Sequence, residues 1–209
     1  MSKALYDDLD RIGRIRLSQS YFMRDFLHSE IAAAYNLANL PDELDLAVEA
    51  GAQLCEQLLE PLQAQFGRLH IRSAYRSCTV NAFGNANGLN CSRNEANYAD
   101  HIWDRRDDLG RMGATACVVV PAFSNVFSEP GDWTELAWWI NDHLPYSSLC
   151  FFPKRWAVNV QWREVPERRI TSYTGWQTET GWKRSGLLTK GSTERQPAQY
   201  ARLSALFAQ

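Results

Sequence analysis

The stretch NEANYADHIWDRRDDLGRMGATACVVV, residues 94–120, decides the fold expected for this chain. Its first part contains a histidine, a tryptophan and several charged residues. Two glycines follow, and then an apolar run that begins near Thr115. Such a run, stopped by Pro121, is typical of a central strand. A polar segment in front of a buried strand often carries chemistry in α+β proteins, so we look for site residues here first.

Helices are expected before and after this strand in the sequence. Apolar residues recur at a 3.6-residue period after Pro41, which predicts a core-facing helix that ends near Phe66. A second helix begins near Trp133, with Asp132 in a position to cap it. Residues 18–34, which start with a serine that can cap, predict a turn followed by a short helix.

Alternating residues predict further strands at 69–73, 149–152 and 156–162. In the last of these, Asn159 and Gln161 lie on the face away from the core. The asparagine- and glycine-rich segment 78–97 is expected to be a loop. We therefore predict an α+β domain over residues 1–170, a small antiparallel sheet with helices packed on one side. Residues 171–209 form an irregular C-terminal extension on the same domain, with a final turn or helix at 200–207.

Composition limits the classes of function. The 209 residues contain 22 basic and 24 acidic side chains, so no electrostatic case for nucleic acid arises. No run approaches the roughly 20 apolar residues that cross a bilayer, and the N-terminus lacks a signal-peptide core. The five cysteines include no CxxC pair, which favours a reducing compartment. We expect a cytoplasmic protein that binds neither membrane nor nucleic acid.

The order of these elements resembles the D-Ala-D-Ala carboxypeptidase-like zinc peptidases of the hedgehog/DD-peptidase fold. The resemblance covers roughly residues 18–169 and is sharpest in Ser73-Ala74-Tyr75-Arg76-Ser77, with Asn81 following. It implies that Arg76 contacts the substrate. In that family two histidines and an aspartate bind zinc, and a nearby acid acts as the base. The zinc lowers the pKa of a bound water, which then attacks a carbonyl.

The family's pattern S-x-H-x-x-G-x-A-x-D falls on Gly113 to Cys117, with Gly110 at the position of its first histidine. Cys117 then stands where the family has its aspartate. In the later strand, Asn159 stands at the second histidine and Gln161 in place of an acid. All three ligand positions depart from the pattern.

Two rearrangements restore possible ligands. A shifted alignment keeps His101 and Asp108, which have the family's spacing of six intervening residues. A rebuilt site combines His101, Asp104 and Cys117, with His143 as a further candidate, because imidazole and thiolate suit zinc or iron. The third reading is a cleft that has lost metal chemistry and binds a ligand.

Each candidate side chain has a specific role in these readings. His101 and Asp104 can bind metal or move protons, and Cys117 can bind metal or act as a nucleophile. Arg76 can hold a carboxylate or an oxyanion. The expected substrate-binding residues are Arg76, Tyr75, Asn159, Gln161 and Trp103, whereas His28 and His70 are expected to be structural.

The leading functional prediction is a divergent peptidase-like protein, with zinc as a possible cofactor. Its reaction would be metal-dependent hydrolysis of an amide in a small peptide or peptidoglycan-derived substrate. The alternative is a catalytically inactive binding module that recognises a peptide-like ligand or a protein partner in the same cleft. A component of a phage or defence-like system is a third possibility.

Overall fold

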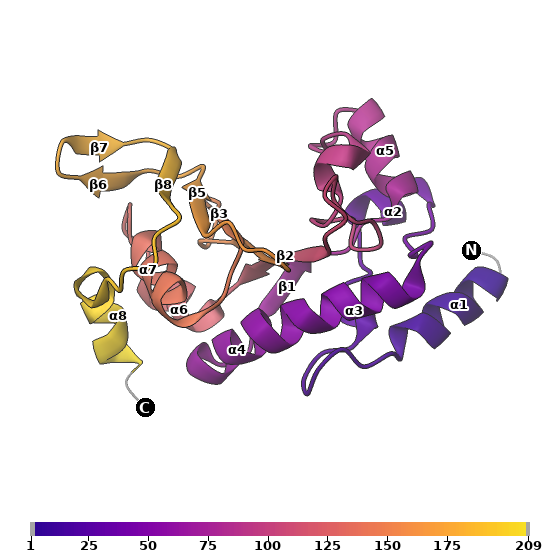
Figure 1. Ribbon diagram of the computed structural model, residues 1–209, viewed down its shortest axis with the longest axis horizontal. Coiled ribbons are helices and arrows are strands. Elements are labelled where there is room, and N and C mark those ends of the chain that lie inside the picture. Colours follow the sequence, from indigo (N-terminus) through magenta and orange to yellow (C-terminus); the bar gives the residue numbers. More distant parts are fainter. Residues whose placement is uncertain (1–2, 208–209) are drawn as a thin grey trace.

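The computed structural model describes residues 3–207, and six strands form its main sheet (Figure 1). Their spatial order is β1 (His70–Ser73), β2 (Gly113–Val119), β4 (Val158–Arg163), β3 (Ser148–Phe151), β5 (Arg169–Ser172) and β8 (Gly186–Lys190). All neighbours are antiparallel except β3 and β5, because the chain turns back after β4 and passes to the far side of β3. The α+β class is confirmed, but the sheet is mixed rather than purely antiparallel.

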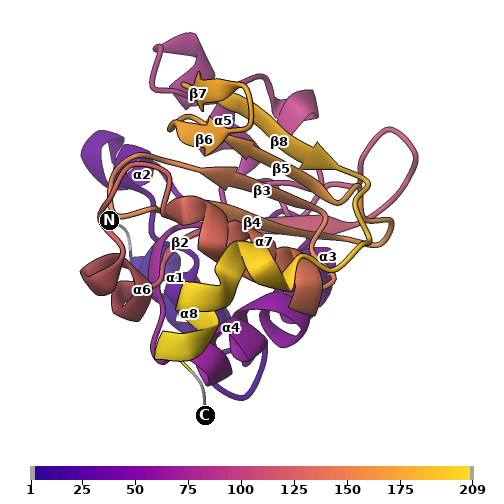
Figure 2. The same ribbon diagram turned by 90° about the vertical axis from the view of Figure 1, so that its left-hand side faces the viewer.

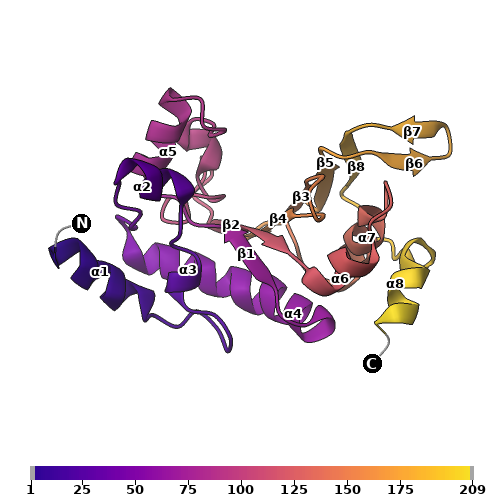
Figure 3. The same cartoon turned by 180° about the vertical axis from the view of Figure 1, so that it is seen from behind.

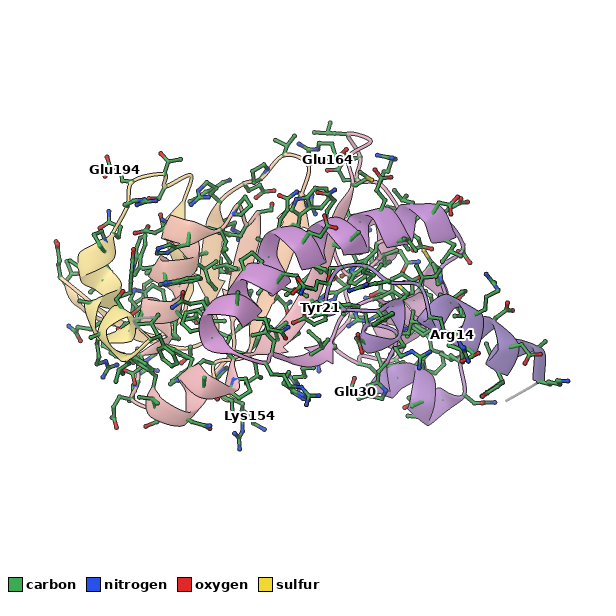
Figure 4. The ribbon with its side chains drawn as sticks, turned by 90° about the horizontal axis from the view of Figure 1, so that it is seen from below. Arg14, Tyr21, Glu30, Lys154, Glu164 and Glu194 are labelled. Atoms are coloured by element: carbon green, nitrogen blue, oxygen red, sulfur yellow. The ribbon has the colours of Figure 1, made fainter. Side chains whose placement is uncertain are left out.

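One long helical segment packs under the centre of the sheet. It consists of α3 (Leu44–Leu54), a π-helical turn (Cys55–Leu59) and α4 (Glu60–Phe66), as the periodicity predicted. Pro61 has no N–H to donate, and the wider turn before it accommodates the missing bond. Helix α3 packs against β2 and β4, and Figure 4 shows this segment crossing in front of the strands.

The remaining helices lie around this sheet. Helix α1 (Lys3–Gly13) lies beside α3, and the helices α6 (Pro121–Val126), α7 (Trp133–His143) and α8 (Ala201–Leu206) cover the other end of the same face (Figures 1 and 2). Helices α2 (Glu30–Tyr35) and α5 (Cys78–Ala86) rise on the opposite side, near β1 and β2 (Figure 3). The helices are therefore not all on one side of the sheet.

The two faces of the sheet differ in chemistry. Ala116, Val158 and Leu149 point into the main core between the sheet and α3, α4 and α7. The alternate positions face the other way, where Figures 1 and 3 show no helix over β3 and β4. We call this side the open face; its cross-strand rows are Cys117–Asn159–Cys150–Thr171 and Thr115–Gln161–Ser148–Arg169.

Two segments differ from the sequence prediction because of individual side-chain hydrogen bonds, which composition does not predict. The segment predicted as a loop at 78–97 begins with α5, whose N-terminus is capped by the Ser77 hydroxyl accepting from the Val80 N–H at 3.2 Å. Asp132 does not cap α7; its carboxylate accepts from Glu129 and pairs with Arg202 of α8.

The C-terminal extension is not irregular. It contains the hairpin β6 (Trp176–Thr178) and β7 (Gly181–Lys183), followed by β8, which pairs with β5 at the edge of the main sheet. The expected boundary at residue 170 falls inside β5. The predicted terminal helix is present as α8. Of the extension, residues 208–209 lie outside the described chain.

Among residues 3–207, every helix is too short or too polar to span a lipid bilayer.

Gly51 in α3 allows the Trp103 ring to lie directly against the helix backbone. A Cβ at this position would lie 2.8 Å from the ring, so we expect Gly51→Ala to destabilise the protein by about 1–3 kcal/mol through overpacking. Urea denaturation measures this change. Helix propensity alone predicts the opposite sign, a gain of roughly 1 kcal/mol, and such a gain would contradict the packing. The loss should be smaller in a Trp103→Phe background, where the ring is smaller.

Candidate functional site

The segment Tyr98–Met112 folds over the start of β2 and carries His101. The Ala99 N–H donates to Arg105 O at 2.9 Å, which closes the segment on itself. The Thr115 N–H donates to Asp100 O at 3.0 Å, and the Trp103 indole donates to Thr115 O at 3.1 Å. These bonds fix the segment to β2 from both sides and hold His101 above the open face.

His101 is also tied to the connection between β1 and α5. Its Nδ1 lies 2.8 Å from Ala74 O, and its backbone carbonyl accepts from the Arg76 N–H at 2.8 Å. A carbonyl oxygen only accepts, so Nδ1 carries the proton and Nε2 of the neutral ring is left with a lone pair. Nε2 faces the Asn159 side-chain amide at 3.4 Å. The histidine therefore links β1, the 98–112 segment and β4.

Burial lowers the pKa of His101, and the nearby Arg76 guanidinium lowers it further. The Asp100 carboxylate and the bond to Ala74 O oppose this shift. The ring is only 8% exposed, and we therefore assign the neutral form at pH 7. The carboxylate that acts on His101 is Asp100, which accepts a short hydrogen bond from the Thr115 hydroxyl.

Arg76 is half-buried beside this histidine. Its Nη1 donates to Asn81 Oδ1 at 3.0 Å and to Cys91 Sγ at 3.2 Å. Asn81 is in turn fixed by donating to Ser92 O and Asn94 Oδ1. The motif residues Arg76 and Asn81, which the sequence placed close together, are thus in direct contact. Both partners of the guanidinium are neutral groups, so its charge is not balanced through them.

Two thiols flank Asn159 on the neighbouring strands. Cys117 of β2 and Cys150 of β3 both occupy positions directly opposite it. Burial raises the pKa of each thiol, with Arg72 opposing the shift at Cys117. Both are therefore protonated at neutral pH, which makes Cys117 a poor nucleophile in this state.

Several predicted site residues lie away from the open face. Asp104 is fully buried, and its carboxylate accepts from the N–H groups of Asp42 and Glu43, which precede α3, at 2.8 and 3.5 Å. It supports a helix start rather than pairing with His101. Trp103 and Tyr75 are also buried, in edge-to-face contact with each other in the core. His143 lies at the end of α7, stacked on Trp139.

Gln161 lies in the open-face row but is only 6% exposed. It accepts from the Ser148 hydroxyl at 2.9 Å and donates to Ala99 O at 3.5 Å. Asn159 is the more accessible of the two predicted amides. The side chains that the structure brings together are therefore Arg76, His101, Cys117 and Asn159, with Gln161 behind them.

The residues aligned with the ligand pattern are not all close together. Gly110 lies exposed in the loop after Asp104, whereas the His101 ring lies beside the Asn159 amide. Cys117 is directly opposite Asn159 on β2, so His101, Cys117 and Asn159 occupy one neighbourhood. The pair of His101 and Asp108 that the shifted alignment predicts is not formed, because Asp108 is exposed in the same loop as Gly110.

The donor set does not fit the three-ligand zinc centre of that family. It offers one imidazole, one protonated thiol and one amide, and an amide is a weak ligand for zinc. Within the described residues, no group of three or more His, Cys, Asp or Glu side chains is arranged to hold a metal ion. We derive no chemical step through a metal.

Sequence reasoning missed Asp100, Cys150 and Arg169. The signal available for Cys150 and Arg169 was their alternation with the core residues Leu149 and Ile170 in short strands. Cys150 lies opposite Asn159, and Arg169 lies in the row of Gln161 and Ser148; both placements depend on the order in which β3, β4 and β5 pair, which alternation alone does not contain.

A scan against protein-family models and searches of curated proteins and of solved structures give no match for this chain.

We expect nitrogen NMR of the imidazoles to show His101 as the neutral Nδ1–H tautomer at pH 7. Because its folded pKa is lowered, the stability supplied by the neutral ring is complete above the unfolded pKa of about 6.5. It is lost as pH falls from there through the folded pKa, since the unfolded chain takes up the proton first. Denaturation between pH 7 and 5 should show a weaker pH dependence in His101→Asn.

The exposed His28 supplies the control, and His28→Asn should keep the wild-type pH dependence. A charged His101 at pH 7 would contradict the lowered pKa, and a neutral ring with its proton on Nε2 would show that the bond to Ala74 O is wrongly assigned.

Proposed function

We propose that the protein binds a short peptide-like ligand on the open face, and that Arg76 holds the carboxylate of this ligand. The observation that carries the proposal is the guanidinium of Arg76. It is half-buried, and among residues 3–207 it forms no ion pair with a carboxylate. An uncompensated cation beneath a surface is costly, and a bound anion would balance it.

The orientation of the guanidinium agrees with this role. Its bonds to Asn81 and Cys91 use Nη1, so the other edge of the planar group remains for a two-point contact with a carboxylate. Glu30 and Arg76 line one small cavity of about 30 Å³ without an ion pair between them. A ligand carboxylate would approach from the side of Asn159 and His101.

Asn159 supplies the second element of recognition. Its amide lies between two thiols on the open face and provides both donors and an acceptor for a peptide group. Neutral His101 beside it adds a lone pair on Nε2. This set suits a polar, uncharged ligand segment next to the carboxylate.

The finer fold assignment is part of the same proposal. Contact between Arg76 and Asn81 and the Cα pairing of Cys117 with Asn159 support a divergent member of the hedgehog/DD-peptidase fold. In this member the cleft would bind its ligand without the family's zinc.

We expect the peptide N-acetyl-Ala-Ala-Ala-Ala with a free carboxylate to bind at least about tenfold more tightly than its C-terminal amide, because a charge-assisted contact contributes about 1.5 kcal/mol or more. Arg76→Gln should remove this difference. Arg76→Lys should keep part of it, since a lysine supplies charge without the two-point geometry. Isothermal calorimetry with both peptides measures the ratio.

Arg93 provides the matched control, because it is an exposed arginine near the same loop. Arg93→Gln should bind both peptides as the wild type does. Equal affinities of the wild-type protein for acid and amide, with the protein folded, would refute the role given to Arg76.

A second candidate function is amide hydrolysis with His101 as the general base. The observation that favours it is the Nε2 lone pair of a neutral, buried imidazole next to Asn159. Cleavage of the same peptide that disappears in His101→Asn would establish it. Metal analysis of the same preparations separates this route from a zinc peptidase, which requires metal near one equivalent per chain and loss of cleavage on its removal.

A further inference from the structure

A second cavity opens on the open face at the other end of the Asn159 row. It has a volume of about 230 Å³ and lies between β5 and the start of β8. Its walls are formed by Cys150, Arg169, Thr171, Ser172, Tyr173, Ser185 and Gly186. Hydroxyl groups and one guanidinium therefore face a space of the size that a small polar group fills.

One cation, Arg169, lines this cavity, and a second cation lies next to it. Lys190 is not part of the cavity wall, but it is directly opposite Arg169 in the antiparallel pair β5–β8. Like charges at opposite positions destabilise a sheet. Neither side chain forms an ion pair with a carboxylate in the described part of the chain, although Glu167 and Glu194 are near in sequence. Both side chains are exposed, so water and salt screen part of the repulsion, and an anion between the two cations would remove the rest.

Two further side chains shape the cavity. The Thr171 hydroxyl donates to Leu149 O at 3.2 Å, so its proton is used within the sheet and is not offered to an anion. The Tyr173 ring is stacked on Phe152 at 5.5 Å and is 68% exposed, which gives the cavity an aromatic wall. The Asp100 carboxylate acts electrostatically on Cys150, and it accepts a hydrogen bond from the Thr115 hydroxyl.

We propose that Arg169 and Lys190, with the hydroxyl of Ser185, form a second subsite that binds an oxyanion of the ligand. This inference rests on the proposed function, because the carboxylate held by Arg76 sets the direction in which the ligand runs. Cys117 on β2 and Thr171 on β5 are separated by three strand spacings, roughly 14 Å. An extended peptide covers that distance in about four residues. The ligand class is then an acidic peptide with an anionic group about four residues before its C-terminal carboxylate.

Four peptides test both subsites in one design. N-acetyl-Glu-Ala-Ala-Ala-Ala is compared with its Gln version, each as free acid and as amide, by calorimetry. We expect the wild-type protein to prefer Glu over Gln by about tenfold, the ratio for one charge-assisted contact. Arg169→Gln should remove the Glu preference and keep the acid preference, and Arg76→Gln should do the reverse.

The outcomes separate the two proposals. If the wild type distinguishes acid from amide but not Glu from Gln, the second subsite is refuted and the proposed function stands. If it distinguishes Glu from Gln alone, the second subsite stands and the role of Arg76 is refuted. Arg14→Gln removes one cation at the far end of the molecule, away from Glu194 and β8 (Figure 4), and should change neither ratio.

Small anions test the subsite without the peptide. Inorganic phosphate and N-acetylglutamate amide are titrated separately into labelled protein, and we expect saturable NMR shifts of the Ser185 and Gly186 amides that weaken about tenfold in Arg169→Gln. The tighter of the two probes identifies a phosphate or a carboxylate as the group recognised. Absence of saturable shifts with both probes would overturn the subsite.

Lys190→Glu tests the same pair of cations by reversing one of the two charges. Replacing repulsion by attraction should raise the melting temperature by roughly 1–3 °C, while anion binding is lost. A variant that is not more stable, or that still binds the anion as the wild type does, would show that the two cations do not act together.

Discussion

The position of the whole site depends on the burial of Trp103 and Asp104 beneath the loop that carries His101. Trp103 fills the space left by Gly51 and donates to β2, and Asp104 accepts from the amides in front of α3. Two adjacent residues of one loop therefore join a strand and a helix. Because both are fully buried, the loop has little freedom, and His101 is held against Ala74 and Asn159. Asp104, predicted to be catalytic or to bind metal, and Trp103, predicted to bind substrate, are both buried, and together they hold the loop in place.

The electrostatics of the open face follow one pattern. Its histidine is kept neutral by burial and by Arg76, and its thiols are kept protonated by burial. The guanidinium of Arg76 is bonded to neutral groups. A surface with neutral titratable groups and uncompensated cations is better suited to binding an anion than to generating a nucleophile. These charges support the proposed binding of an anion more than the proposed hydrolysis.

Sequence pattern predicted the elements whose burial is local and periodic. The long helix before Phe66, the strand after Met112 and the strand around Val160 all follow from spacing. It failed where one side-chain bond decides the structure, as at Ser77, whose hydroxyl starts α5. It also failed to bring His101 and Cys117 together, because the loop 104–112 separates them in the sequence and its course is not periodic. The partners of Asn159 are fixed by strand order, which no short window of sequence contains.

The pairing at the centre of the sheet has a consequence for how the protein is made. Strand β2 lies between β1 and β4, so it does not pair with β3, the next strand in the sequence, and Cys117 faces Asn159 across the pair with β4. At the C-terminal end, Phe207 contacts Phe66 edge to face at 5.3 Å and accepts from Gln65. During synthesis the chain must therefore be made as far as Phe207 before the Phe66 ring of α4 is covered. Until then α4 presents uncovered aromatic surface, and chaperone binding during translation would protect the nascent chain at this stage.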